Sequence, residues 1–195
     1  MKLENKVILI TGAGKGLGRK LAEELAARGA IIAANDISPI NVEEVVAGIH
    51  ARGGKAKSFV EDIAKKVGAQ SVIKNVEDDF GTVDILINHA AVEPHVSLLT
   101  MDEWDWHRTL DVNLTGAFLM IQTAGRVMKA KGSGVILNLV AGSSNGSDQE
   151  AGAYFASKAG LAELSHQADA ELSRHGVRVF AIRSLEEAIR VLEEA

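Results

Sequence analysis

The chain has 195 residues, 47% of them apolar, and a formal net charge of -5. This length favours one domain with one sizeable core. Charges are scattered without blocks, which argues against nucleic-acid or acidic-membrane partners and favours a small molecule. The absence of cysteine excludes disulfides and thiolate metal sites, and no His/Asp/Glu set has metal-ligand spacing. No apolar run has signal-peptide or membrane length, so we expect a cytoplasmic protein.

Short β-branched runs alternate with segments of helical periodicity along the chain. We expect strands at 6–11, 31–36, 55–60, 83–88, 134–140 and 177–182. We expect helices at 16–28, 42–52, 67–80, 101–129 and 153–173. Thr100 and Glu103 have the spacing of a capping box at the start of the fourth helix. The alternation predicts βαβ units and a parallel sheet.

The strand runs VILI, DILI and VILNLV are apolar at successive positions, so helices are expected on both faces of the sheet. This pattern predicts a three-layer, doubly wound α/β domain over residues 1–183. Residues 184–195 read as a helix of the same domain, with Ser184 as its N-cap. No strand follows that helix, so the fold is expected to be truncated after the sixth strand.

A glycine-rich turn, TGAGKGLG at 11–18, joins the first strand to the first helix. Gly12, Gly16 and Gly18 would let the backbone approach a bound group closely. The exposed N–H groups and the helix dipole at such a turn favour a pyrophosphate. The turn therefore predicts a dinucleotide site in a Rossmann fold.

Asp36 ends the second strand, 18 residues past Gly18. A carboxylate there can accept hydrogen bonds from a ribose diol and would repel a 2′-phosphate, which favours NAD over NADP. Lys15 in the glycine turn favours the phosphate instead, and we weigh Asp36 more heavily. The alternative is that Asp36 only caps the turn before Ser38 and Pro39.

Tyr154, the only tyrosine, lies four residues before Lys158 in an expected helix, so the two side chains share one face. A nearby ammonium stabilises a phenolate and lowers the pKa of a tyrosine toward neutrality. Such a pair can exchange a proton with a carbonyl or hydroxyl oxygen. Taken alone, a pair with this spacing is also common on helix surfaces.

The motifs together resemble the short-chain dehydrogenase/reductase family of the classical type. The matching pieces are TGAGKGLG at 11–18, Asp36, Asp62 with Ile63, NHAA at 88–91, DVNLTG at 111–116 and YFASK at 154–158. They occur in family order with family-like spacing, from the start of the chain to about Ile182.

The resemblance implies hydride transfer between a nicotinamide cofactor and an alcohol or ketone. Tyr154 would be the acid–base residue, Lys158 would lower its pKa and bind the nicotinamide ribose, and Asn113 would hold a water of the proton relay. The cofactor-binding residues would be Gly12, Lys15, Gly16, Leu17, Gly18, Asp36, Asp62, Ile63, Asn88, Ala90, Tyr154 and Lys158. The family resemblance also implies a homodimer or homotetramer.

The sequence departs from the family pattern where a serine should orient the substrate carbonyl. Alignment on Asn138 places Val140 and Ala141 at the two family serines, and neither side chain can donate a hydrogen bond. Ser143 is the candidate replacement and Ser144 a second, unless both belong to a solvated Gly/Ser loop.

The usual Pro-Gly turn and substrate lid after the sixth strand also have no counterpart. Two hypotheses therefore stand: an NAD-dependent oxidoreductase, and a catalytically impaired NAD(P)-binding protein acting as a sensor or subunit.

Overall fold

A computed structural model of the protein describes residues 2–140 and 150–194. Ala141, Ser143 and Ser144 lie outside these residues. The described residues form one sheet of six parallel strands in the order β3-β2-β1-β4-β5-β6. This arrangement confirms the predicted doubly wound fold.

The observed elements alternate along the chain as expected. The strands are β1 (Val7–Thr11), β2 (Ile31–Asp36), β3 (Lys55–Val60), β4 (Ile85–Asn88), β5 (Gly134–Leu139) and β6 (Val177–Ile182). The α-helices are α1 (Gly16–Ala27), α2 (Pro39–Ala51), α3 (Lys66–Phe80), α4 (Glu103–Leu110), α5 (Ala117–Lys131), α6 (Gly152–Leu172) and α7 (Leu185–Glu194). A π-helical segment, η1 (Asp111–Gly116), separates α4 from α5, and a short 3₁₀ turn, η2 (Ser173–His175), follows α6.

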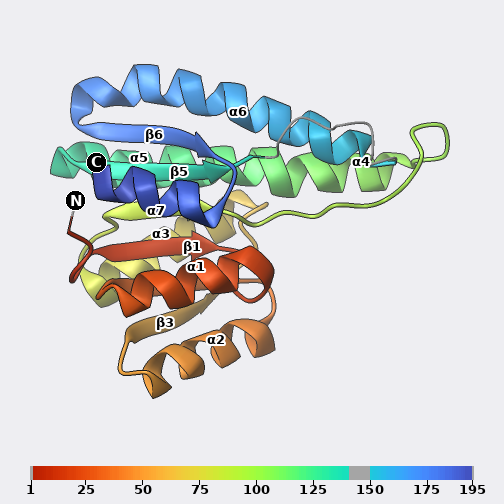
Figure 1. The fold of residues 1–195 in the computed structure, drawn as a ribbon. Coiled ribbons are helices and arrows are strands. Elements are labelled where there is room, and N and C mark those ends of the chain that lie inside the picture. Colours follow the sequence, from red (N-terminus) through yellow and green to blue (C-terminus); the bar gives the residue numbers. More distant parts are fainter. Residues whose placement is uncertain (1, 141–149, 195) are drawn as a thin grey trace.

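Helices cover both faces of the sheet and form the three predicted layers (Figure 1). One core cluster joins α1, α2 and α7 to one face, with Ile8 and Leu25 fully buried. The other joins α3, α5 and α6 to the opposite face, with Leu9 and Met120 fully buried. Alternate residues of β1 thus enter different cores, which explains why its run VILI is apolar throughout.

The expected helix over 101–129 differs in two respects. It contains the π-helical turn η1, and it begins at Glu103 with Asp102 as its N-cap. The side chain of Asp102 accepts a hydrogen bond from the backbone N–H of Asp105 at 2.8 Å. The predicted capping box of Thr100 and Glu103 is therefore wrong, because the chain enters the helix two residues later and a different side chain meets its first N–H groups.

The strand order reverses direction between β1 and β4, which pair directly with each other. In open α/β sheets ligands bind at such a switch point, beyond the carboxyl ends of the strands. Here that edge carries the glycine turn after β1 and the residues after β4. The fold therefore places the glycine turn at 11–18 beside residues 88–91, which follow β4.

Only Arg183 and Ser184 separate β6 from α7. The hydroxyl of Ser184 accepts a hydrogen bond from the backbone N–H of Glu187 at 3.1 Å, as predicted for an N-cap. The helix buries Ala188 and Leu192 against the sheet. Of the helices described, none combines the length and apolar character that crossing a membrane requires.

Candidate active site

The glycine turn after β1 is closely packed. Gly12 has φ +66°, a backbone conformation that side-chain-bearing residues rarely adopt. A Cβ on Gly18 would lie 2.2 Å from the carbonyl oxygen of Gly12 and 2.6 Å from Nδ1 of His89. The turn therefore requires glycine at both positions, and it brings backbone N–H groups to the start of α1, where an anion is favoured.

Asp36 connects the end of β2 to the glycine turn. Its Oδ2 accepts a hydrogen bond from the N–H of Gly14 at 2.9 Å, and its Oδ1 accepts one from the N–H of Ser38 at 3.0 Å. Asp36 therefore caps the turn before α2, as the alternative interpretation held. Each carboxylate oxygen has a further lone pair, so the same side chain can also accept hydrogen bonds from a ribose diol.

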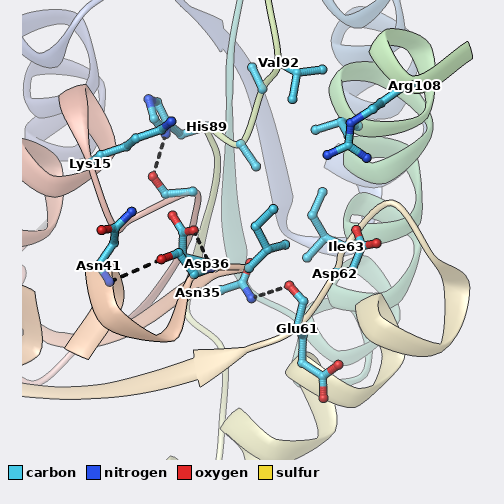
Figure 2. A pocket seen from close by; sticks show the side chains of 16 residues that line it. Lys15, Asn35, Asp36, Asn41, Glu61, Asp62, Ile63, His89, Val92 and Arg108 are labelled. Atoms are coloured by element: carbon cyan, nitrogen blue, oxygen red, sulfur yellow. Dashed lines mark hydrogen bonds between the residues drawn. The ribbon is translucent and has the colours of Figure 1, made fainter. Parts of the chain in front are cut away.

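A pocket of about 260 Å³ opens at this edge of the sheet (Figure 2). Lys15 and His89 lie on one side of it and Arg108 on the opposite side. The predicted cofactor-binding residues among its lining are Gly12, Lys15, Asp36, Asp62, Ile63 and Ala90. The lining also includes Asn35, Asn41 and Arg108, which the sequence interpretation missed.

His89 fastens the residues after β4 to the glycine turn. Its Nδ1 lies 3.1 Å from the carbonyl oxygen of Gly12, so Nδ1 carries the proton and donates. Burial, followed by the charge of Lys158, lowers the pKa of His89 below its ordinary value. The ring is therefore neutral at pH 7 and leaves Nε2 as a hydrogen-bond acceptor.

Asn88 has an unused acceptor in the interior. The hydroxyl of Ser165 donates a hydrogen bond to the carbonyl of Leu161 and accepts one from Nδ2 of Asn138. Oδ1 of Asn138 accepts a hydrogen bond from Nδ2 of Asn88 at 2.8 Å. This chain of hydrogen bonds orients both amides. Oδ1 of Asn88 is left buried with no donor among the described residues. An orphaned acceptor here is what a bound group with a hydroxyl or amide donor would satisfy.

Tyr154 and Lys158 lie on α6, with the Lys158 Nζ atom 5.7 Å from the centre of the tyrosine ring. Lys158 is only 3% exposed, and its Nζ donates to the carbonyl of Leu139 at 2.7 Å. Burial lowers the pKa of Lys158 to about 8. The pKa of Tyr154 is raised instead, first by burial and then by the charge of Glu93. The downward shift expected for Tyr154 is therefore not found in the protein without a coenzyme.

Asn113 lies in the π-helical turn and braces two neighbouring segments. Its Nδ2 donates to the carbonyl of Val92 at 2.9 Å and to Oγ of Ser157 at 3.0 Å. Its Oδ1 accepts from the N–H of Val92 at 2.8 Å. These bonds use both N–H donors of the amide and one lone pair of its oxygen, so a water in a proton relay could meet only the remaining lone pair of Oδ1 or the backbone of Asn113.

Glu93 is a further residue that the sequence interpretation missed. It follows Val92 directly and is exposed. Its carboxylate raises the pKa of Tyr154 and opposes the lowering of the pKa of Lys158. The sequence offers no periodicity or motif at this position, so only the fold brings Glu93 into range of α6.

The predicted site residues thus gather at one edge of the sheet but in two groups. Gly12, Lys15, Asp36, Asp62, Ile63 and Ala90 line the pocket. Asn113, Tyr154 and Lys158 are held together from η1 and α6, and Asn88 lies between the two groups in the interior. Gly16, Leu17 and Gly18 shape the start of α1, whereas Ser143 lies outside the described residues. In the part of the chain that the structure describes, no group of three or more His, Asp or Glu side chains could hold a metal.

The six-stranded parallel sheet with helices on both faces is a Rossmann-type α/β fold, and comparison with known proteins gives its family. The family model for short chain dehydrogenases matches residues 6–184. The chain therefore belongs to the short-chain dehydrogenase/reductase family, whose members are NAD(P)-dependent oxidoreductases.

Individual relatives support the same assignment. D-threitol dehydrogenase of Mycolicibacterium smegmatis is 35% identical over 181 residues, covering 93% of this chain and 70% of the relative. A 3-oxoacyl-[acyl-carrier-protein] reductase of Staphylococcus epidermidis is 36% identical over 181 residues, covering 91% and 73%. The crystal structure of NAD⁺-bound xylitol dehydrogenase matches with a TM-score of 0.89 at 30% identity, covering 94% of this chain and 71% of that one.

Proposed function

We propose that the protein transfers a hydride between NAD(H) and a hydroxyl or carbonyl group of a small substrate, with Tyr154 as general acid and base. The observation that carries this proposal is the placement of Tyr154 and Lys158 on one face of α6, at the same sheet edge as the glycine turn. The orphaned Oδ1 of Asn88 between them supports a bound group that spans both.

The residues present fit a dinucleotide at this edge. Gly12, Lys15, Gly16, Leu17 and Gly18 would meet the pyrophosphate and its ribose, Asp36 the adenosine ribose, and Asp62 and Ile63 the adenine. Asn88, Ala90, Tyr154 and Lys158 would border the ribose on the nicotinamide side. When bound, the coenzyme supplies or accepts the hydride.

Tyr154 and Lys158 would handle the proton that accompanies the hydride. In reduction, the phenol of Tyr154 donates its proton to the substrate oxygen, and a raised pKa keeps that proton available at neutral pH. In oxidation, the phenolate must form first, and the ammonium of Lys158 stabilises it. Asn113 holds the Val92 backbone and α6 in position for this exchange.

We favour NAD over NADP because Asp36 directs a carboxylate into the pocket that would receive the ribose. The crystallised xylitol dehydrogenase that this chain resembles contains NAD⁺. Lys15 lines the same pocket and is the residue that would favour a 2′-phosphate.

The test has a binding part and a turnover part. Fluorescence titrations with NADH and NADPH are expected to show tighter binding of NADH. The substitution Asp36→Ala is expected to reduce the difference in affinity between the two nucleotides. Turnover of simple ketones and alcohols is expected to fall by about 10²-fold or more in Tyr154→Phe. Equal turnover of the variant and the wild type would refute the role of Tyr154, and failure of both nucleotides to bind would refute the coenzyme site.

The second candidate function is a coenzyme-binding protein with impaired turnover. It is favoured by Val140, which stands at the first family serine position, is 5% exposed and offers no hydroxyl. Loss of one donor to a reacting oxygen typically lowers kcat by about 10²- to 10³-fold without removing the coenzyme site. NADH binding with turnover equal in wild type and Tyr154→Phe would support this candidate.

A replacement donor is tested separately. If Ser143 orients the substrate carbonyl, Ser143→Ala lowers kcat by a similar factor while NADH affinity is unchanged. Ser144→Ala is its matched control. A loss in Ser144→Ala alone would transfer the role to that residue.

We also propose that the protein is a homodimer or homotetramer that pairs through α5 and α6. A shallow groove runs between these helices, lined by Phe118, Ile121, Leu164 and Leu172 among others. Phe118 is 42% exposed, so a large apolar side chain faces solvent in the single chain. Contact with a second subunit would cover it.

A further inference from the structure

The imidazole of His89 lies directly against the glycine turn. A Cβ added to Gly12 would lie 3.0 Å from Nδ1 of His89, and one added to Gly18 would lie 2.6 Å from the same atom. The backbone N–H groups of His89 and Ala90 both donate to Oγ1 of Thr11, at 3.1 Å and 3.2 Å. The ring therefore has a fixed place beside the turn that would receive a pyrophosphate.

The protein uses only one nitrogen of this imidazole. Nδ1 of His89 donates to the carbonyl of Gly12 at 3.1 Å, so the neutral ring carries its proton there. Nε2 has no hydrogen-bond partner among the described residues, and the protein does not enclose it. The side chain lines the pocket at the edge of the sheet (Figure 2). Nε2 is therefore the atom that the ring offers to a bound molecule.

The surroundings of His89 keep the ring neutral in the protein without a coenzyme. Burial lowers the pKa of His89 most, the charge of Lys158 on α6 lowers it further, and the charge of Asp36 at the end of β2 raises it. The other charged side chains that line the pocket are Lys15, Glu61, Asp62 and Arg108. A ligand that brings negative charge beside the imidazole would act in the same direction as Asp36 and raise the pKa.

A phosphate oxygen favours one protonation state of His89. An ionised phosphate oxygen can only accept hydrogen bonds, whereas the neutral ring presents a lone pair at Nε2. The protonated ring presents an N–H at Nε2 and keeps the hydrogen bond from Nδ1 to Gly12. Hydrogen bonds from a cationic donor to phosphate are among the strong ones in proteins. Protonation of His89 and binding of a pyrophosphate should therefore favour each other.

We propose that His89 takes up a proton when the dinucleotide binds, so that its imidazolium becomes part of the site for the pyrophosphate. This inference rests on the proposed coenzyme site but does not require hydride transfer. Because binding and protonation are linked, the affinity for the dinucleotide rises as pH falls from the pKa of the bound protein to that of the free protein. A ring that accepted a hydrogen bond from a ribose hydroxyl would stay neutral and give no such rise.

The first test counts protons with ADP-ribose, which carries the adenosine and the pyrophosphate of the coenzyme but undergoes no hydride transfer. Calorimetric titrations at about pH 6, in buffers with different ionisation enthalpies, measure the protons taken up for each molecule bound. The wild type is expected to take up a measurable fraction of one proton, and His89→Asn close to none. The amide N–H of Asn can replace the Nδ1 donor to Gly12 but cannot titrate.

Two further variants separate proton uptake from the support that His89 gives to the glycine turn. His50→Asn removes an exposed histidine of α2, and its proton uptake is expected to match that of the wild type. His89→Ala removes the bond to Gly12 as well, so it is expected to bind ADP-ribose more weakly at every pH. If His89 only supported the turn, His89→Asn would keep the proton uptake of the wild type.

A second measurement follows the imidazole itself. The NMR signal of the C2 proton of His89, assigned by its absence from His89→Asn, gives the midpoint of the titration with and without saturating ADP-ribose. This midpoint is expected below 6.5 in the free protein and at higher pH in the complex. The affinity of the wild type for ADP-ribose is accordingly expected to rise by at least about fivefold between about pH 8 and pH 5, and that of His89→Asn to change much less.

The outcomes distinguish this inference from the proposed function. Binding of ADP-ribose without proton uptake, or a midpoint that does not rise, would overturn the role of His89 and leave the hydride-transfer proposal standing. Proton uptake that persists in His89→Asn belongs to another group and contradicts the inference equally. A protein that binds NADH but not ADP-ribose would also rule it out. Failure to bind either molecule would refute the coenzyme site and this inference together.

Discussion

At the scale of single residues, Lys158 places an ammonium where water cannot solvate it. The side chain is 3% exposed, and burial lowers its pKa from 10.5 to about 8. Burial of a charge destabilises the folded state unless an opposite charge compensates for it, and the charge of Glu93 offsets only part of the effect of burial on Lys158. The position of Lys158 in the site therefore lowers the stability of the coenzyme-free protein.

We expect Lys158→Met to increase the free energy of unfolding at pH 7 by roughly 1 kcal/mol while abolishing turnover. The burial penalty that the variant removes exceeds the hydrogen bond to Leu139 that it loses. Denaturant unfolding of the coenzyme-free protein measures the change, and Lys20→Met, at an exposed position of α1, is the control. A less stable Lys158→Met protein would contradict the expectation.

The same residue predicts a pH dependence with a definite sign. Below pH 8 the lysine is protonated in both folded and unfolded states, so the full penalty is present. Between about pH 8 and pH 10.5 the unfolded chain keeps a proton that the folded protein has released, so wild-type stability rises with pH. The advantage of Lys158→Met is therefore expected to shrink across this window. An advantage that grew there would show that the lysine is not destabilised by burial.

At the scale of elements, the start of α4 depends on one cap. Asp102 accepts a hydrogen bond from Asp105, whereas the hydroxyl of Thr100 donates only to the carbonyl of Ser97, at 3.4 Å. We expect Asp102→Ala to lower the free energy of unfolding by about 1 kcal/mol and Thr100→Ala to change it by less than about half of that. Chemical denaturation of the two variants measures the difference. A larger loss of stability in Thr100→Ala than in Asp102→Ala would support the capping box of Thr100 and Glu103.

The elements also show which parts of the molecule were predictable. Apolar periodicity is a local property, and it placed each helix and strand within a few residues of its observed bounds. The π-helical turn was not predicted, and its residue Asn113 bonds to Val92 in a contact that only the fold creates. Asp36 and the glycine turn were identifiable from local spacing. Glu93, Arg108 and the network of Asn88 and Asn138 were not, because each depends on segments that meet only in the fold.

At the scale of the whole molecule, the face formed by α5 and α6 is the proposed contact between subunits. Phe118→Glu would place a charge in that contact, so we expect light scattering after size exclusion to show smaller particles than for the wild type. Val67→Glu changes a 78% exposed residue of α3 and is expected to leave the particle mass unchanged. A wild-type protein that is already monomeric, or a mass unaffected by Phe118→Glu, would rule out this contact.

The clamp between Asn113 and the backbone of Val92 has a consequence for how such a site can diversify. Because the amide binds main-chain atoms, it holds the start of the segment 92–98 whatever side chains that segment carries. A substitution at one of residues 93–98 can then change a side chain beside the candidate site without releasing the backbone of Val92 from Asn113. Single side-chain changes in this segment are therefore expected to be compatible with a folded protein.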